Sequence, residues 1–159
     1  MGNVRYLALV AILASLTGAT ALPATAPLAG LHYLVGTWNC TYSAGATRLA
    51  YNATYAYDHD GHILRQIATY KGGGDEELLA YDAQHHRWTA VVLDDQGNAT
   101  VMRAPGSDSS RIAYRSVYPD TSIAVTFDRT SATKYLLHGT IHLGGKTITS
   151  VDTCVRNGA

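Results

Sequence analysis

The feature that most constrains the fold is a series of ten short strand-like runs joined by short turns. Neighbouring runs pair antiparallel, because their connections are too short to hold the crossover helices that parallel strands require. No segment beyond the N-terminal region has the apolar spacing of an amphipathic helix. The pattern predicts an all-β fold, a ten-stranded antiparallel up-and-down meander. Its runs cover residues 35–42, 48–57, 62–70, 77–81, 88–93, 98–104, 111–118, 121–128, 134–143 and 146–156.

The turns between the runs carry the residues that reverse a chain. Residues 58–61, Asp-His-Asp-Gly, and the pair Gly144-Gly145 are typical of hairpin turns. The glycine-rich segment 71–75 is predicted to be a mobile loop.

The N-terminal residues have the pattern of an export signal. Arg5 precedes an apolar stretch from Tyr6 to Leu16, and Ala19-Thr20-Ala21 is a small-x-small cleavage site. The stretch is too short to span a membrane, which takes about 20 apolar residues. We therefore expect a secretory signal peptide at residues 1–21, a flexible leader at 22–31 and a β-barrel domain at 32–159. The expected location is secreted or periplasmic.

The chain has two cysteines, Cys40 in the first run and Cys154 in the last. Cysteines in an exported protein usually pair, because that compartment is oxidising. A disulfide would make the first and last strands neighbours and close the meander into a barrel. An open sandwich is the alternative, and it would leave two unpaired edge strands.

The charge pattern limits the partners. Twelve basic residues balance twelve acidic ones, and no basic block is present. Nucleic acid is therefore not an expected partner. The meander, the Gly36-Thr37-Trp38 segment and the aromatic-rich runs lead us to expect a small hydrophobic molecule as the partner.

The segment Leu34-Val35-Gly36-Thr37-Trp38 resembles the Gly-x-Trp opening strand of the calycin superfamily, which includes lipocalins, fatty-acid-binding proteins and nitrobindin-like barrels. The Tyr81-Asp82…Trp88 hairpin and the late cysteine are similar to small exported proteins of unassigned function with nitrobindin-like barrels. The resemblance implies a calycin-like barrel in which Trp38 plugs one end. The nitrobindin haem motif, Gly-x-Trp-x-Gly-x-Gly, is not met, because Cys40 and Tyr42 stand where glycines would be.

Tyrosines and arginines within the runs are the candidate ligand-binding residues. Aromatic walls with a few polar tips are typical of small-molecule sites, and a guanidinium suits a carboxylate ligand. The alternative for the arginines is an exterior position beside acidic residues. The candidates are Tyr55, Tyr70, Tyr135, Arg65 and Arg115.

Histidines are the candidate haem or metal ligands. His138 and His142 point to one side of a strand, but they lie roughly 13 Å apart, too far to share one metal. One of them could ligate haem, and the alternative is a pair of partly exposed strand residues. Histidines in two hairpins, at residues 59, 62, 85 and 86, suggest a surface zinc or copper site or ordinary turn chemistry.

The leading hypothesis is an exported barrel that binds a small, mostly apolar molecule in its lumen without catalysis and without a required cofactor. The sequence has no Gly-x-Ser-x-Gly nucleophile motif. A haem- or metal-binding barrel, or a structural protein with a filled core, are the alternatives. An enzyme would need a buried acid–base pair, such as Asp152 with a histidine.

Overall fold

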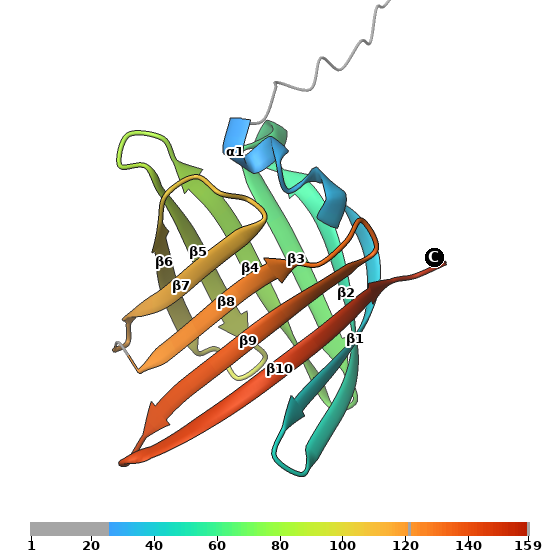
Figure 1. The fold of residues 1–159 in the computed structure, drawn as a ribbon, viewed down its shortest axis with the longest axis vertical. Coiled ribbons are helices and arrows are strands. Elements are labelled where there is room, and N and C mark those ends of the chain that lie inside the picture. Colours follow the sequence, from blue (N-terminus) through green and yellow to red (C-terminus); the bar gives the residue numbers. More distant parts are fainter. Residues whose placement is uncertain (1–25, 121, 159) are drawn as a thin grey trace, which may run out of the picture.

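The computed structural model describes residues 26–120 and 122–158, and they form one closed antiparallel barrel (Figure 1). Each strand pairs with its neighbours in sequence, and β1 pairs with β10, which confirms the predicted meander and its closure. An open sandwich is thereby excluded. The elements are α1 (Ala26–Ala29), the 3-10 helices η1 (His32–Leu34) and η2 (His59–Gly61), and the strands β1 (Gly36–Ala44), β2 (Thr47–Asp58), β3 (Ile63–Tyr70), β4 (Gly73–Asp82), β5 (Arg87–Asp94), β6 (Ala99–Pro105), β7 (Arg111–Tyr118), β8 (Ile123–Arg129), β9 (Lys134–Leu143) and β10 (Lys146–Arg156).

The predicted disulfide fastens the closing seam of the barrel. Cys40 and Cys154 are directly opposite each other in the β1–β10 pairing, and their sulfurs are bonded at 2.03 Å. Both side chains are buried. The bond joins residues 114 positions apart in the chain, so it fixes the first strand to the last.

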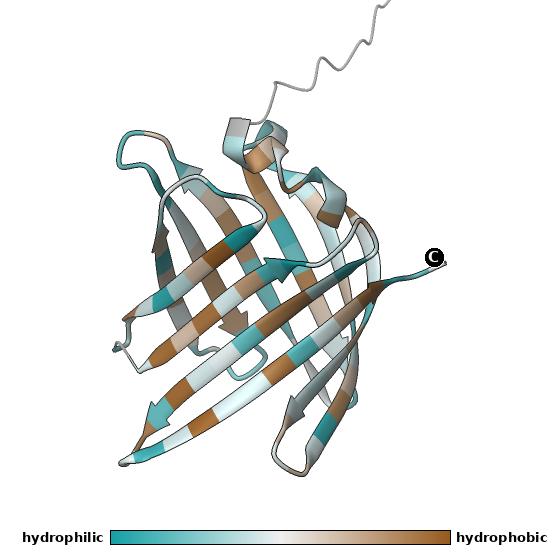
Figure 2. Cartoon of the chain, viewed as in Figure 1, coloured by the Kyte–Doolittle hydropathy of each residue, from teal (hydrophilic) through white to brown (hydrophobic). Residues whose placement is uncertain are grey.

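Alternation along the strands separates an inner from an outer face. Hydrophobic and hydrophilic bands alternate along β8, β9 and β10 in Figure 2. In β2 the tyrosine-rich face points inward, where Tyr55 and Ala53 are buried. In β3 the inner face holds Leu64 and Gln66, because successive residues of a strand point to opposite sides.

One end of the barrel is covered by α1 and η1, and we call it the closed end. Leu28, Leu31 and Leu34 have no exposed surface there. The Tyr57 hydroxyl donates a hydrogen bond to the Leu28 carbonyl at 2.9 Å. The Arg156 guanidinium donates to the carbonyls of Val35 and Tyr33.

These contacts correct the expectation that residues 22–31 form a flexible leader. From residue 26 onward the segment is folded, because its leucines complete the core at the closed end. The predicted signal peptide, residues 1–21, lies outside the described residues.

The predicted mobile loop at residues 71–75 is also wrong. Gly73, Gly74 and Asp75 are the first residues of β4 and pair with the end of β3. A Cβ atom on Gly74 would lie 2.6 Å from the Ala68 carbonyl oxygen, so glycine allows the two strands to approach here. A glycine run can therefore mark close strand pairing as well as mobility.

Among the described residues, no helix has the length and apolar character needed to cross a membrane.

Candidate functional site

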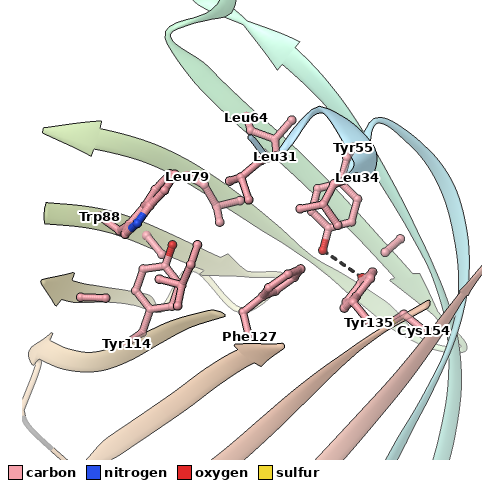
Figure 3. Close-up of a cluster of buried hydrophobic side chains, with 14 of the residues drawn as sticks. Leu31, Leu34, Tyr55, Leu64, Leu79, Trp88, Tyr114, Phe127, Tyr135 and Cys154 are labelled. Carbon is pink, nitrogen blue, oxygen red and sulfur yellow. Dashed lines mark hydrogen bonds between the residues drawn. The ribbon is translucent and has the colours of Figure 1, made fainter. Parts of the chain in front are cut away.

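The half of the lumen beneath the closed end is filled by packed side chains (Figure 3). The ring centroid of Tyr135 lies 4.9 Å from that of Trp38 and 4.9 Å from that of Phe127. The Trp38 indole nitrogen donates to the Leu34 carbonyl at 2.7 Å, and the Arg156 guanidinium lies 4.7 Å from the Trp38 ring centroid. Trp38 is fully buried at this end, and its role as a plug of the barrel stays a prediction.

A short chain of hydrogen bonds borders the filled half. The Gln66 amide donates to the Tyr55 hydroxyl at 3.1 Å, and that oxygen lies 3.0 Å from the Tyr135 hydroxyl. The dashed line in Figure 3 marks the second of these contacts. All three side chains are buried, so each depends on the others for its polar partner.

The other half of the lumen is hollow and holds two adjoining cavities. The inner cavity has a volume of about 190 Å³ and is lined mainly by apolar and aromatic residues of β4 to β9. The outer cavity has a volume of about 390 Å³ and reaches Tyr42, Leu49 and Tyr70 near the β1–β2 and β3–β4 turns. We call that end of the barrel the open end. The two cavities share the lining residues Glu77, Val92, Leu137 and Asp152.

Two acidic side chains therefore stand at the junction of the cavities, Glu77 on β4 and Asp152 on β10. Burial raises the pKa of Glu77 from 4.5 to about 7, although its side chain keeps some accessible surface toward the cavities. Burial also raises the pKa of Asp152 from 3.8 to about 6. Among the described residues, no lysine, arginine or histidine lines either cavity.

Two polar atoms of residues that line the inner cavity have no hydrogen-bond partner among the described residues. They are Oδ1 of Asp152 and the hydroxyl of Tyr114, which is only 3% exposed. Tyr114 lines the inner cavity and reaches inward from β7 in Figure 3. Burial and the nearby charge of Glu77 raise the pKa of Tyr114 well above its usual value. A buried hydroxyl without a partner can donate to a bound molecule at no cost to the fold.

The structure places the predicted tyrosines in three different positions. Tyr55 lines the inner cavity, and Tyr70 lines the outer cavity and donates a hydrogen bond to Asp75 at 3.3 Å. Tyr135 belongs to the filled half and lines neither cavity. Their role in ligand binding stays a prediction.

The predicted arginines lie on the outer wall. Arg65 is exposed and forms an ion pair with Glu76 at 2.7 Å, and Arg115 is exposed on β7. Both have the strand parity opposite to that of the lumen-facing residues, Gln66 and Tyr114 beside them. The expectation that they meet a carboxylate inside the barrel is therefore corrected.

The candidate haem ligands also lie outside the lumen. His138 and His142 are exposed on β9, and Nδ1 of His142 lies 3.0 Å from the Thr147 hydroxyl. The cavity walls offer no histidine among the described residues, so they do not fit a histidine-ligated haem. Nor does the described part of the chain bring three or more His, Cys, Asp or Glu side chains together as a metal site, the hairpin histidines included.

Sequence reasoning missed Glu77 as a site residue and named Asp152 only as the acid of a hypothetical enzyme. A usable signal was present for Asp152. A disulfide across the closing seam puts Cys154 on the inner face, and a residue two positions away shares that face. Glu77 shares parity with Leu79 in the same way.

Comparison with known proteins gives the fold alone. No protein-family model matches the chain, and no curated protein matches its sequence. Among solved structures, it is similar to an S-type phycobiliprotein lyase, CPES from Guillardia theta, with a TM-score of 0.51, 8% sequence identity, and coverage of 80% of this chain and 90% of that chain. The chain therefore shares its overall fold, a closed antiparallel β-barrel, with that protein.

Proposed function

We propose that this protein is an exported binding protein that holds a small, mostly apolar molecule in the hollow half of its barrel and does not alter it chemically. The observation that carries the proposal is the pair of adjoining cavities, which reach the open end and have largely apolar and aromatic walls. Concave sites of this composition bind small molecules by burying most of their surface.

The closed end indicates that the lumen is a binding cavity open at one end, and not a channel through the barrel. The leucines of residues 26–34 and Trp38 fill the barrel beneath α1 and η1, so a bound molecule enters and leaves at the open end. A structural protein with a completely filled core would not leave the 390 Å³ outer cavity. The fold neighbour is named as a lyase, and it contributes the fold and not an activity to this proposal.

Two features support binding without catalysis. Both cysteines are oxidised in the disulfide, so neither is a thiolate nucleophile. Asp152 has no histidine beside it in the cavity walls of the described chain, so the acid–base pair required by the enzyme hypothesis is not formed there.

Export is supported by the N-terminal signal pattern and by the disulfide. A buried disulfide that joins the first and last strands suits an oxidising compartment. Mass spectrometry of the protein secreted by its host, or by a bacterial expression strain, measures the mature N-terminus. A mature chain that starts after residue 21 agrees with the proposal, and a chain that retains residues 1–21 inside the cell contradicts export.

A matched pair of valines tests the binding site. Val92 lines both cavities, whereas its neighbour Val91 has the opposite strand parity and faces outward. We expect phenylbutanol and the neutral dye Nile red to bind the wild type, and Val92→Phe to weaken binding by about tenfold or more by filling the junction. Val91→Phe serves as the control and leaves binding unchanged.

Isothermal titration calorimetry measures the affinity for phenylbutanol, and the fluorescence of Nile red measures the affinity for the dye. Circular dichroism confirms that both variants fold. Failure of both probes to bind, or binding that Val92→Phe leaves intact, contradicts a lumenal site.

A further inference from the structure

We propose that the molecule held in the lumen is an organic cation, with an apolar body and a protonated amine that pairs with Glu77 and Asp152. This inference rests on the proposed function and specifies the ligand class of the same site. It differs from that proposal by assigning the charge and the position of the ligand's polar group.

The first argument is the position of the two carboxyl groups. Glu77 and Asp152 reach the lumen from β4 and β10, and each lines both cavities. A molecule that extends from one cavity into the other therefore passes both carboxyl groups. The apolar residues Val92 and Leu137 complete the junction and suit the body of such a molecule.

The second argument is the missing countercharge. In the described chain the ion pairs lie on the outer wall and at the β4–β5 turn, where Arg65 pairs with Glu76, and His85 and Arg87 pair with Asp82. Neither lumenal carboxyl group takes part in them. An ionised carboxylate without a cation is unfavourable in a cavity with apolar walls, and a bound ammonium group would supply the cation.

The third argument concerns buried hydrogen-bonding groups without partners. Tyr114 is 97% buried and lines the inner cavity, and within the described part of the chain neither its hydroxyl nor Oδ1 of Asp152 has a hydrogen-bond partner. The Tyr114 hydroxyl can donate or accept a hydrogen bond, and Oδ1 of Asp152 can accept one. An ammonium group carries three donors, so it can bond to a carboxylate and to a phenol oxygen together.

The walls also suit a cation through their aromatic faces. Tyr51 lines the outer cavity, and Tyr55, Tyr114 and Phe127 line the inner one. Aromatic rings attract ammonium groups through their negative faces. A metal ion fits less well, because the described residues bring no group of three or more ligating side chains together.

The ionisation of the acids gives the proposal a pH signature. The groups that face Glu77 from the surrounding strands are acids and phenols, and no base faces it within the described chain. Burial raises the pKa of Glu77 to about 7 and that of Asp152 to about 6, so both are largely ionised at pH 8 and largely protonated at pH 5. Cation binding should therefore weaken as the pH falls through this range. The titratable groups that line the two cavities with Glu77 are Asp75 and Asp152, with Tyr42, Tyr51, Tyr55, Tyr70 and Tyr114.

Three probes with the same apolar body test the proposal: phenylbutylamine, phenylbutanol and phenylbutyrate, titrated calorimetrically into the full-length mature protein at pH 8. We expect the affinity for the amine to be at least about tenfold higher than that for the alcohol, and the affinity for the carboxylate to be lower than both. At pH 5 the advantage of the amine over the alcohol should shrink by about tenfold, while the affinity for the alcohol stays constant.

Variants of the two lumenal acids test whether the preference for the amine comes from these carboxyl groups. Glu77→Gln and Asp152→Asn should each reduce the affinity for the amine about tenfold more than the affinity for the alcohol. Glu76→Gln is the matched control, because Glu76 is the neighbouring residue on the outer face. An amine that binds no better than the alcohol, or an advantage that survives both lumenal variants, overturns the cation proposal while lumenal binding stands. If none of the three probes binds, the proposed function fails as well.

Discussion

Replacing Glu77 with glutamine should stabilise the empty protein at high pH. Burial raises the pKa of this carboxyl from 4.5 in the unfolded chain to about 7 in the barrel, so the folded protein binds the proton more tightly. Between about pH 4.5 and 7 the folded state holds more protons than the unfolded state, and stability falls as the pH rises. Each tenfold change in proton affinity corresponds to about 1.4 kcal/mol, so the full penalty above pH 7 is roughly 3 kcal/mol.

Glutamine carries no such charge, so Glu77→Gln should remove most of this penalty. Because the cavity side of Glu77 keeps some contact with solvent, we expect a gain of about 1–3 kcal/mol in the free energy of unfolding at pH 8. The gain should be much smaller at pH 5, where the folded wild type is already protonated. Asp75 and Asp152 face the same lumen, and their ionisation at high pH adds to the effect in the same direction.

Urea unfolding at pH 5 and pH 8 measures these differences. Glu76→Gln is the control: it breaks an exposed ion pair with Arg65 and should lower stability by less than about 1 kcal/mol at both pH values. A loss of stability in Glu77→Gln at pH 8, or an equal effect at both pH values, would refute the view that Glu77 is an acid without a countercharge.

Three further perturbations test the architecture. Removing the disulfide in a Cys40→Ala/Cys154→Ala double variant should cost about 4–5 kcal/mol, because the bond closes a loop of 114 residues in the unfolded chain; an unchanged urea midpoint would argue against this. Leu31→Ala should cost about 2–5 kcal/mol in the same assay, since Leu31 is completely buried, whereas Leu143→Ala at a 68% exposed position should have almost no effect; similar losses in both would show that the closed end is not part of the core. Tyr55→Phe should cost about 1–3 kcal/mol by leaving the Gln66 amide unsatisfied, while Tyr114→Phe removes a hydroxyl without a partner and should be neutral or slightly stabilising; a larger loss in Tyr114→Phe than in Tyr55→Phe contradicts the hydrogen-bond assignment.

The architecture was predictable because it depends on local and additive signals. Short turns force antiparallel pairing, and ten strands with a cysteine in the first and the last close on themselves. Glycines 73 and 74 led to the wrong prediction of a mobile loop, because glycine occurs both in mobile turns and in closely paired strands. Only the position of the partner strand distinguishes the two cases. The fold of residues 26–31 was missed because its two leucines, Leu28 and Leu31, gain their stability from tertiary burial, which no local pattern records.

The site was harder to predict because it depends on which strand face points inward. In β3 the sequence places Arg65 between two isoleucines, yet the structure turns all three outward and leaves Leu64 and Gln66 inside. In β4 the adjacent residues Glu76 and Glu77 look alike in sequence and have different environments, a partly exposed ion pair on the outer wall and a cavity junction. One fixed reference, the inward position of Cys40 and Cys154, determines the parity of β1 and β10, and pairing registers carry it to the other strands.

The arrangement of the two chain ends has a practical consequence. Residue 26 begins the cap over the closed end, and β10 finishes beside β1 at Trp38, so both ends of the described chain lie opposite the open end (Figure 1). A fusion partner, purification tag or surface linker joined at either of these ends would lie on the side of the barrel opposite the open end and would leave the cavity entrance unobstructed. Immobilised through either end, the protein would present its entrance to the solution, which suits it to capture assays on a sensor surface.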